Sequence, residues 1–571
     1  MSFRDKIKTL TEEGRQALFR VETIGRVGMK LGMPQAMTLP GVKVLAREVA
    51  RGKLNPSLLF RLHAENVPER TALIQATSPG HRDHEGVRRI YSYRETNETI
   101  DRIAQGLHRR GLGRGTAALL LLKNRIELLM IQPAQGRIGG TVVPASWRST
   151  VPEIEYLAHH ARARAIFFDA DIAEVIREAL PRLESIPQGN FISVGGKAEG
   201  FTSFEELVAE GGGEAPDHSE DSAVVMYTSG TTGKPKGARR SIQKEAFAAA
   251  MAFLGETPLT LGGVHLAACP LYHATAFGFT GFAFLLGGTI AVMADFKPEP
   301  FLELVERHHV ESTALVPTMI HRLVELGPSV VRKYDTSSLK AIFSGGAPLS
   351  GPLAIEAMNL LGDKIYNFYG ATETGIVTLA KPEDLRASPG TIGRAVPGNE
   401  IHIVDDQGRE CGVDQVGELY AKNGMMVDGY DKDPDATKSA RMPSGCFSVG
   451  DLARRDARGC YHIEGRKRDM IISGGVNVYP AEVEGVLHEH PAVSEAAVVG
   501  VPDREWGERV RAFVVLRAGA DASDDDLKAH CRARLAGPKV PRDYVFLAAL
   551  PKNPTGKVLK RELRMMEGAG S

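Results

Sequence analysis

The chain has 571 residues, of which 43% are hydrophobic and 25% charged, so it is long enough for several globular domains. Lysine plus arginine total 70, as do aspartate plus glutamate, which excludes the strong positive field of a nucleic-acid-binding protein. The five cysteines include no C-x-x-C pair, which argues against a zinc cluster or disulfide framework and favours a reducing compartment.

Residues 1–56 form a basic leader that differs from the rest of the chain. Residues 1–53 hold 11 Lys/Arg against 5 Asp/Glu. An amphipathic helix is predicted by apolar residues at helical spacing, namely Phe3, Ile7, Leu10, Ala17, Leu18, Val21 and Ile24. Such a helix either lies on an anionic membrane or docks on the protein's own body. Charges in the opening "MSFRDKIKTL" argue against a secretory signal, so we expect a cytoplasmic protein, with or without membrane association.

From about residue 57 onward, strand-like and helix-like runs alternate. "TAALLLL" (Thr116 to Leu122) and "RAIFFDA" indicate strands, and "EIEYLAHHA" between them indicates a helix. This alternation predicts a large multi-layer α/β domain with mostly parallel sheets over residues 57–467. The pattern then changes to short pieces such as "AEVEGVLHEHP" and "VSEAAVVGVPD". They predict a small α+β domain with its own core over residues 468–571.

The uncharged window "ATAFGFTGFAFLLGGTIAVMA", from Ala274 to Ala294, is long enough to cross a bilayer. We interpret it differently, because Gly287-Gly288 divides it into a helix and the strand-like "TIAVM". Both pieces are expected to be buried in the core.

A loop rich in glycine and hydroxyl groups follows a predicted buried strand in "AVVMYTSGTTGKPKGARR", from Ala223 to Arg240. Its backbone N–H groups, hydroxyls and lysines are suited to binding a polyphosphate. The spacing differs from the common G-x-x-x-x-G-K-[ST] loop, because Gly230 and Gly233 are too close and Pro235 follows Lys234. A solvated hairpin tip of the same composition is the alternative.

Four clusters further along the chain carry potential chemistry: "YNFYGATETG" (Tyr366 to Gly375), "CFSVGD" (Cys446 to Asp451), "GRKRDMIISGGVNVYPAEVE" (Gly465 to Glu484) and "LPKNPTGKVLKREL" (Leu550 to Leu563). Each is weak alone. In this order and spacing they resemble the adenylate-forming superfamily of acyl-CoA synthetases, luciferases and adenylation domains. The resemblance extends from about residue 57 and includes "PLYHATAFG", "VPTMIHRL", "SGGAPL" and "GTIGRAVPG".

The resemblance implies a reaction in two steps. A carboxylate attacks the α-phosphate of ATP to give acyl-AMP and pyrophosphate, and a thiol then displaces AMP. Anions meet in the first step, so cations and fixed donors are required. The cofactors implied are ATP, Mg²⁺ and coenzyme A. The partners are small molecules, namely the acid, ATP and CoA, and no nucleic acid is expected.

Site residues follow from the same resemblance. The phosphate loop would use Thr228, which is also assigned to catalysis, with Ser229, Gly230, Thr231, Thr232, Gly233 and Lys236. Glu373 would be catalytic and bind Mg²⁺, since a hard cation prefers carboxylate oxygen. Lys557 would bridge the substrate carboxylate and the α-phosphate. Further nucleotide contacts are assigned to Gly346, Ala347, Tyr369 (adenine), Gly370, Thr372 (α-phosphate), Asp451 (ribose) and Arg466.

Members of this family rotate the small domain between the two steps, so the C-terminal domain is expected to be mobile. Arg468 matches the hinge position. Gly474 and Gly475 would line the tunnel for the pantetheine arm, because glycine permits close backbone approach. "CFSVGD" departs from the commoner "WF-x-T-GD" but keeps Phe447 and Asp451.

An apolar acid is the predicted substrate. The acyl pocket is assigned to His273, Val316, Gly345 and Gly370; a strand-end histidine is the alternative for His273. The sequence "GGVNVYP" resembles CoA ligases, and the chain ends soon after Lys557, so free CoA is the expected acceptor. Transfer to a separate carrier protein and an inactive lipid-binding homologue are the alternatives. Intact Lys557, Glu373 and Asp451 argue against the inactive homologue.

Overall fold

The protein is described by a computed structural model covering residues 12–50, 57–76, 90–212, 223–228, 236–241, 244–504, 506–552 and 557–566. The chain divides into two compact units, which are described separately below. Unit 1 comprises Met1–Ala314, Ser329–Ile342 and Asn423–Ser439. Unit 2 comprises Leu315–Pro328, Phe343–Lys422 and Ala440–Ser571.

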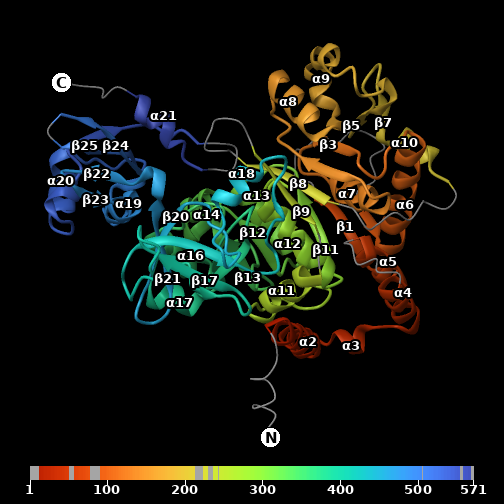
Figure 1. Cartoon of the computed structure of the whole chain (residues 1–571), viewed down its shortest axis with the longest axis horizontal. Helices are drawn as coiled ribbons and strands as arrows, with labels where there is room; N and C mark the ends of the chain where they lie inside the picture. The colour runs from red at the N-terminus through yellow and green to blue at the C-terminus, as the bar shows by residue number, and fades with distance from the viewer. Residues whose placement is uncertain are drawn as a thin grey trace, which may run out of the picture. The chain divides into compact units, whose positions relative to one another are not determined.

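An eight-stranded sheet lies in unit 1, in the order β19-β9-β8-β4-β3-β5-β6-β7. Its central strands pair in parallel, and all five residues of β3 are buried. A sheet covered on both faces needs such continuous apolar strands. Figure 1 shows α8 and α9 together on one side of this sheet, away from α6 and α7. The strands are β3 (Ala117–Leu121), β4 (Thr141–Pro144), β5 (Ala163–Asp169), β6 (Phe191–Val194), β7 (Thr202–Ser203), β8 (Ala223–Thr228), β9 (Lys236–Ser241) and β19 (Gly429–Tyr430).

Helices of unit 1 connect and cover these strands. Helix α6 begins with a capping box, in which Ser92 accepts from the Glu95 amide and the Glu95 carboxylate accepts from the Ser92 amide. The helices are α6 (Tyr93–Arg109), α7 (Ile126–Arg137), α8 (Val151–Ala161), α9 (Ala173–Ala179), α10 (Phe204–Glu210), α11 (Lys244–Gly255), α12 (Ala274–Leu285), α13 (Pro298–Arg307) and α18 (Pro434–Ser439).

Unit 1 also holds the β12-β10-β11-β1-β2 run of a nine-stranded sheet, in which β1 and β2 are antiparallel and the other pairs parallel. These strands are β1 (Thr71–Ala76), β2 (Ile90–Ser92), β10 (Val264–Ala267), β11 (Thr289–Met293) and β12 (Ser312–Leu315). The window from Ala274 to Ala294 forms α12 and β11, separated by Gly287 with a φ of 60°. The predicted division into a helix and a strand is therefore confirmed. None of the helices in the described ranges is both long and apolar enough to cross a membrane.

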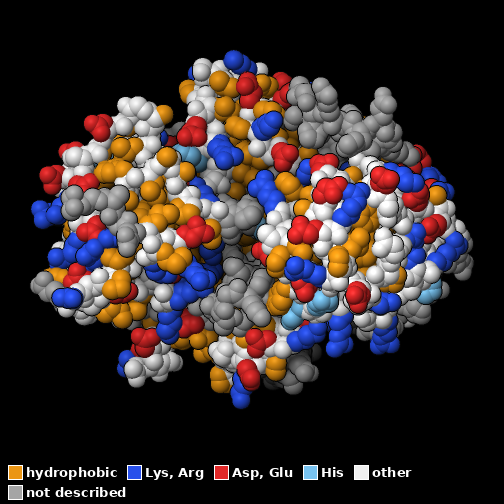
Figure 2. Space-filling model, turned by 90° about the horizontal axis from the view of Figure 1, so that it is seen from above, with side chains coloured by type: hydrophobic (Ala, Val, Ile, Leu, Met, Phe, Trp, Pro, Cys, Tyr) orange, Lys and Arg blue, Asp and Glu red, His pale blue; other side chains and the backbone are white. Residues whose placement is uncertain are grey.

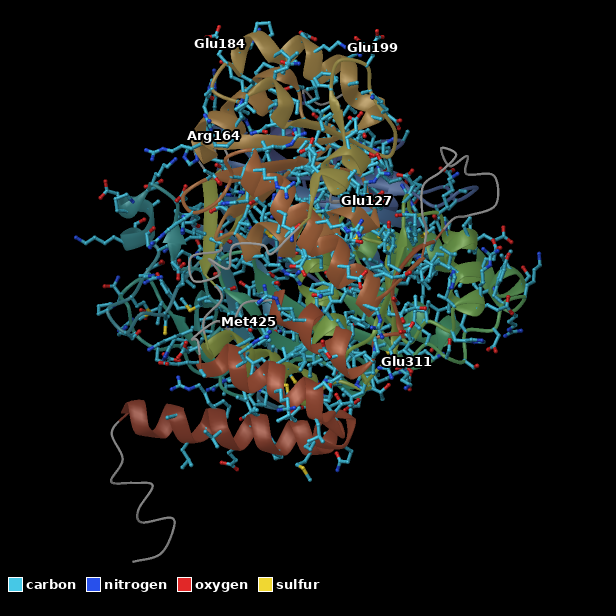
Figure 3. All side chains as sticks on the ribbon, turned by 90° about the vertical axis from the view of Figure 1, so that its right-hand side faces the viewer. Glu127, Arg164, Glu184, Glu199, Glu311 and Met425 are labelled. Carbon is cyan, nitrogen blue, oxygen red and sulfur yellow. The ribbon has the colours of Figure 1, made fainter. Side chains whose placement is uncertain are left out.

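The described part of the leader is helical and packs on other helices of unit 1. Helix α2 lies against α11, where Val27 is buried and Arg20 Nη1 is 2.9 Å from Glu245 Oε1. Helix α4 packs on α5, and the backbone N–H of Thr38 donates to Asn66. Figure 3 shows α2 with part of its side chains pointing away from the body. These helices are α2 (Glu12–Lys30), α3 (Met33–Ala36), α4 (Leu39–Ala50) and α5 (Ser57–Asn66).

Unit 2 contains the β16-β15-β14 run of the nine-stranded sheet and a four-stranded antiparallel sheet, β17-β18-β20-β21. The strands are β14 (Ile365–Ala371), β15 (Gly375–Ala380), β16 (Arg394–Ala395), β17 (Glu400–Val404), β18 (Gly417–Lys422), β20 (Asp451–Arg455) and β21 (Tyr461–Arg466). Its helices in this part are α14 (Pro317–Glu325), α16 (Gly351–Leu361) and α17 (Pro382–Ala387). Strand β13 (Ala341–Ser344) and helix α15 (Gly327–Val331) complete the described elements before residue 467.

The C-terminal part of unit 2 has a sheet and core of its own. Strands β24 and β25 form a long antiparallel pair, and β26 adds in parallel to β25. Its elements are β22 (Ile471–Ser473), β23 (Val476–Val478), α19 (Pro480–His488), β24 (Val493–Asp503), β25 (Gly507–Leu516), α20 (Asp524–Arg532), β26 (Asp543–Phe546) and α21 (Lys560–Met565). A buried apolar cluster joins β22, β24 and β25 to α19 and α20. The predicted fold class, parallel α/β layers plus a smaller α+β part, is confirmed.

Charged side chains of both signs are interspersed over the face shown in Figure 2. This agrees with the equal totals of acidic and basic residues in the sequence.

Candidate active site

The candidate phosphate loop joins two antiparallel strands of unit 1. Strand β8 ends at Thr228 and β9 begins at Lys236, and these two residues are register partners. Gly237 lies in close packing, because a Cβ there would come within 2.9 Å of Val225. The residues between the strands, 229–235, lie outside the described part of the chain, and so do Ser229, Gly230, Thr231, Thr232 and Gly233 of the predicted set.

Glu373 lies in the tight turn between β14 and β15 of unit 2, with Thr372 before it. The side chain of Glu373 is buried, at 7% exposure. The turn is fixed by a hydrogen bond from the Ala371 amide to Thr374 Oγ1 (3.1 Å). Gly370 cannot carry a side chain here, because a Cβ would lie 2.1 Å from the Gly375 carbonyl oxygen. The hairpin therefore presents a buried carboxylate at a defined position.

Asp451 is held by two partners at the beginning of β20. The Tyr369 hydroxyl donates to its Oδ2 (2.8 Å), and Arg466 Nε lies 3.1 Å from its Oδ1. Asp451 and Arg466 are direct register partners on β20 and β21. Burial, followed by the nearby Asp451 charge, raises the pKa of Tyr369 well above its usual value, so the hydroxyl remains a donor. Asp451 is 8% exposed, and the guanidinium compensates its buried charge.

The charges of Asp451 and Arg466 act on the ammonium group of Lys557. Burial is the largest influence on its ammonium and lowers its pKa to about 8, with Arg466 lowering it further and Asp451 opposing. Arg468 and Asp469 act on the same ammonium. Lys557 from the C-terminal segment is thus brought together with Asp451 and Arg466, which are about a hundred positions earlier in the sequence.

The "SGG" turn follows β13, which ends at Ser344. Gly345 faces Phe368, and a Cβ on Gly345 would lie 2.3 Å from that ring. Gly346 has a φ of 78°, which favours glycine, and Ala347 comes next. The Ser344 hydroxyl is buried with no hydrogen-bond partner among the described residues.

His273 precedes the first turn of α12 in unit 1. Burial lowers its pKa to about 4, so the ring is neutral at neutral pH. Its ring centroid is 4.3 Å from that of Tyr272, and Nε2 is buried without a partner in the described part of the chain. Val316, the other predicted pocket residue, is 9% exposed and precedes α14 in unit 2.

Asn124 is a positioning residue that the sequence reasoning did not identify. Its Nδ2 donates to the carbonyls of Cys269 (2.9 Å) and Met293 (3.1 Å), and its Oδ1 accepts from the Leu271 amide (2.8 Å). It thereby fixes the backbone just before His273. A buried asparagine directly after the strand "ALLLLK" was the available signal.

The predicted tunnel glycines lie on the β22–β23 turn in unit 2. Gly474 packs on Trp506, because a Cβ would come within 2.6 Å of the indole, and the Gly474 amide donates to the Trp506 carbonyl (2.8 Å). Gly475 has a φ of 77° and open space around its Cα. Arg468, the predicted hinge residue, lies in the short 3-10 helix Lys467–Asp469.

Glu373 on its tight turn and Asp451 beside Tyr369 and Arg466 belong to the motifs from which the family resemblance was drawn. The chain belongs to the family of AMP-binding enzymes: the family model for the AMP-binding enzyme matches residues 60–431, and that for the AMP-binding enzyme C-terminal domain matches residues 482–557. The resemblance predicted from the motifs is confirmed. The chain is accordingly a member of the adenylate-forming acid–thiol ligases, whose enzymes use ATP, Mg²⁺ and coenzyme A.

Curated relatives cover nearly the whole chain. A fatty acid–[acyl-carrier-protein] ligase, ScoC, from Streptomyces coeruleorubidus is 31% identical over 88% of this chain and 97% of its own. A feruloyl-CoA synthase from Amycolatopsis is 33% identical over 84% of this chain and 94% of its own. The long-chain-fatty-acid–CoA ligase FadD13 of Mycobacterium tuberculosis is 31% identical over 83% and 92%, respectively.

Solved structures have the same fold. The amide bond synthetase McbA from Marinactinospora thermotolerans superposes with a TM-score of 0.78 at 27% identity, covering 89% of this chain and 99% of that chain. ATP-bound MatB from Rhodopseudomonas palustris superposes with a TM-score of 0.77 at 29% identity, covering 90% and 98%.

Proposed function

We propose that this protein is an ATP-dependent acyl-CoA synthetase, which activates a fatty or other apolar carboxylic acid as acyl-AMP and transfers the acyl group to coenzyme A. The arrangement of Tyr369, Arg466 and Lys557 around Asp451 carries the proposal. A carboxylate accepts two hydroxyl donors of a ribose more strongly than a neutral group does. The adjacent cations suit the phosphate attached to that ribose.

Nucleotide binding is assigned to the residues around Asp451. Asp451 accepts from the ribose hydroxyls, and Arg466 holds its second oxygen in place. Tyr369, with its hydroxyl anchored on Asp451, offers its ring to adenine. The Gly345-Gly346-Ala347 turn gives the base close access to the backbone. Gly370 allows the β14–β15 hairpin to close behind the nucleotide.

Phosphate chemistry is assigned to three elements. The loop from Thr228 to Lys236 holds the leaving pyrophosphate with backbone N–H groups, hydroxyls and a lysine. Thr372 donates to the α-phosphate. Glu373 fits a Mg²⁺ ion, because it offers a buried carboxylate oxygen and this metal takes its remaining ligands from phosphates and water. When bound, the ion neutralises charge on the phosphates.

Lys557 acts in the first step. The substrate carboxylate attacks the α-phosphorus, the bond to the pyrophosphate oxygen breaks, and negative charge accumulates at the α-phosphoryl oxygens. An ammonium between the carboxylate and that phosphate stabilises both. In the second step the CoA thiol loses its proton, sulfur attacks the acyl carbon and AMP leaves.

The second step is assigned to the C-terminal part. We place the large domain at residues 57–467 and the small domain at 468–571, with Arg468 as the hinge. Gly474 and Gly475 line the pantetheine tunnel. The rotation replaces Lys557 by these glycines at the reacting centre.

The acid is assigned as apolar on the evidence of His273. A histidine whose pKa is lowered to about 4 carries no charge at neutral pH, so it offers no cation to a second carboxylate. Val316 and Phe279, a buried residue in the middle of α12, are apolar as well. Among the three relatives described above, two are named for fatty acids and one for the aromatic ferulate.

The test is pyrophosphate release against a panel of fatty, aryl and dicarboxylic acids, with and without CoA. We expect release with apolar acids, and acyl-CoA formation when CoA is present. Pyrophosphate release with no acyl-CoA product would overturn the assigned acceptor. A protein that releases no pyrophosphate with any of the acids would support the alternative of an inactive lipid-binding homologue.

A carrier protein is the second candidate acceptor, because the relative ScoC is a fatty acid–[acyl-carrier-protein] ligase. The same assay with a phosphopantetheinylated carrier protein in place of CoA distinguishes the two. A thioester formed only on the carrier would establish this alternative.

We also propose that the leader contacts anionic membranes through the face of α2 and α4 that points away from the body. This leader face is defined by exposed apolar residues with basic neighbours: Val21, Arg26, Met29, Leu39, Val42 and Lys43. An apolar surface bordered by cations is typical of helices that lie in the membrane interface. Docking of α2 on α11 uses Val27 and Arg20, neither of which belongs to this face, so both contacts are compatible.

A further inference from the structure

In the described part of the chain, one group of potential metal ligands lies apart from the candidate active site. It consists of Glu400, His402 and Cys446 in unit 2, which can each offer an atom so that all three atoms lie within 4.8 Å of one another. Glu400 and His402 are on the same face of β17, because side chains two positions apart on a strand point the same way. Cys446 comes from the segment whose Phe447 pairs with Ala421, next to β17.

His402 is already oriented as a metal ligand would be. Its Nδ1 is 3.0 Å from Glu410 Oε2, and its Nε2 is 2.8 Å from Glu400 Oε1. Glu410 is brought there by the hairpin in which it pairs with Val404. Zinc-bound histidines characteristically donate their second ring N–H to a carboxylate, which fixes the tautomer and increases ligand strength. Glu410 is in the position for that role.

We propose that Glu400, His402 and Cys446 bind one Zn²⁺ ion, with Glu410 as the positioning residue behind His402 and water as the fourth ligand. A thiolate, an imidazole and a carboxylate form a ligand set that suits zinc, whereas Mg²⁺ and Ca²⁺ prefer oxygen alone. The thiolate and the Glu400 carboxylate together balance the charge of the ion.

The geometry needs only a small adjustment. Zinc bonds of about 2.0–2.3 Å place tetrahedral ligand atoms roughly 3.5 Å apart. The three atoms lie within 4.8 Å of one another, so shifts of about 1 Å are enough, and His402 Nε2 and Glu400 Oε1, at 2.8 Å, move slightly apart. The side chains of His402 and Glu400 are 33% and 49% exposed, which leaves room for this movement and a path for the ion. Lys422, the register partner of Glu400, donates its Nζ to the Ser444 carbonyl (3.1 Å), so a backbone oxygen engages its ammonium.

The bound ion would anchor the segment that carries Asp451. Beyond Cys446 this segment is tied by Ser448, whose hydroxyl donates to Glu418 (2.7 Å) and accepts from the Gly450 amide (2.9 Å). The sequence did not predict this site, because the cysteines lack C-x-x-C spacing. Its ligands come from segments more than forty residues apart and meet only in the fold.

Metal binding by the full-length, metal-free protein tests the proposal without any activity assay. We expect one Zn²⁺ per chain, measured by competition with a chromophoric chelator, and a thiolate-to-metal charge-transfer band when Co²⁺ is added instead. Cys446→Ser should remove that band. Glu410→Gln should weaken zinc affinity by about 10- to 100-fold while leaving the stoichiometry unchanged.

Two further variants complete the test. Cys411→Ser removes a neighbouring cysteine that is not a ligand, so its zinc affinity and cobalt band should match the parent. Glu400→Gln changes a half-exposed side chain, so it should fold and still lose affinity, even where Cys446→Ser lowers the melting temperature. A parent protein that binds no Zn²⁺, or a cobalt band that persists in Cys446→Ser, would overturn the proposal.

Discussion

Asp451 shows how a buried charge is kept available for a ligand. Among the described residues, Tyr369 Oη donates to its Oδ2 at 2.8 Å and Arg466 Nε lies 3.1 Å from its Oδ1. A carboxylate has about four acceptor positions, so two protein contacts leave lone pairs for the ribose hydroxyls. The guanidinium balances the charge, and the tyrosine sets the orientation. In the proposed function, nucleotide binding adds hydrogen bonds to a group whose desolvation is already compensated.

Replacing Lys557 by alanine should abolish adenylation selectively. The ammonium stabilises charge only in the first step, so pyrophosphate release should fall by about 10²–10³-fold, the scale for one such donor. Thioester formation from supplied acyl-AMP should remain near the parent rate. Lys560→Ala is the matched control, because it removes the same charge from a side chain that pairs with Glu484 instead (2.6 Å). Equal loss in both half-reactions would contradict the assignment.

The pH dependence of adenylation follows from the same lysine. Its pKa of about 8 in the free protein means that the charged form is lost as the pH rises through 8. Since kcat/KM reports on the free enzyme, kcat/KM for ATP should fall about tenfold per pH unit above that value. The thioester step from supplied acyl-AMP should lack this decline. Lys557→Arg, which keeps its charge, should shift the decline upward; an unchanged profile would exclude Lys557 as its source.

At the scale of elements, the strands that the sequence predicted correctly are those with continuous apolar runs. The predicted strand from Thr116 to Leu122 is observed as Ala117–Leu121, and "TIAVM" is observed as β11. Burial on both faces requires such runs, so composition alone identifies them. The β14–β15 hairpin was recognised only as a motif. Its turn requires glycine at position 370, because a Cβ there would lie 2.1 Å from the Gly375 carbonyl oxygen.

The local sequence identified the motifs of the candidate site but not how their side chains are grouped. The grouping of Lys557 with Asp451 and Arg466 was implied only by family resemblance, since these residues are distant in sequence and nothing local connects them. The bond from the Tyr369 hydroxyl to Asp451 and the role of Asn124 were not predicted at all. Both depend on tertiary packing that brings polar atoms together inside a low-dielectric interior.

Gly475→Leu tests the assignment of the β22–β23 turn to the CoA step. The position has a φ of 77°, so any side chain adds backbone strain, but open space surrounds it. Gly475→Ala imposes the same strain with little bulk and is the control. We expect Leu, but not Ala, to block acyl-CoA formation while pyrophosphate release continues in both. Acyl-CoA formation by the leucine variant at the alanine variant's rate would show that the tunnel lies elsewhere.

At the scale of the whole molecule, the leader has two opposite surfaces. One packs on the rest of unit 1. There Val27 is buried beside Gly255, because a Cβ on Gly255 would lie 2.9 Å from a Val27 methyl group. Glu48 is also buried, between Arg47 and Arg61. The other is the leader face, with Val42 and Leu39 exposed. Phe3, Ile7 and Leu10, which the sequence assigned to the same helix, lie outside the described residues.

Deleting residues 1–50 should therefore change stability and membrane binding together, and point variants should separate the two effects. Val27→Asp places a charge in the α2–α11 contact, so the melting temperature should fall with no vesicles present. Lys43→Glu combined with Arg26→Glu changes only exposed charges. It should leave the melting temperature unchanged yet weaken co-sedimentation with anionic vesicles, because each basic residue contributes about 1 kcal/mol near such a surface.

The salt dependence of vesicle binding and the activity of the truncated protein complete the test of the leader. Vesicle binding that weakens as salt rises supports the basic leader face, whereas binding that the double charge variant leaves intact would refute it. The truncated protein should still release pyrophosphate with a soluble short acid, since Asp451, Arg466 and Lys557 all belong to unit 2 and none of the assigned residues lies in the leader. A truncated protein that stays folded and cannot form acyl-AMP would show that the active site extends into residues 1–50.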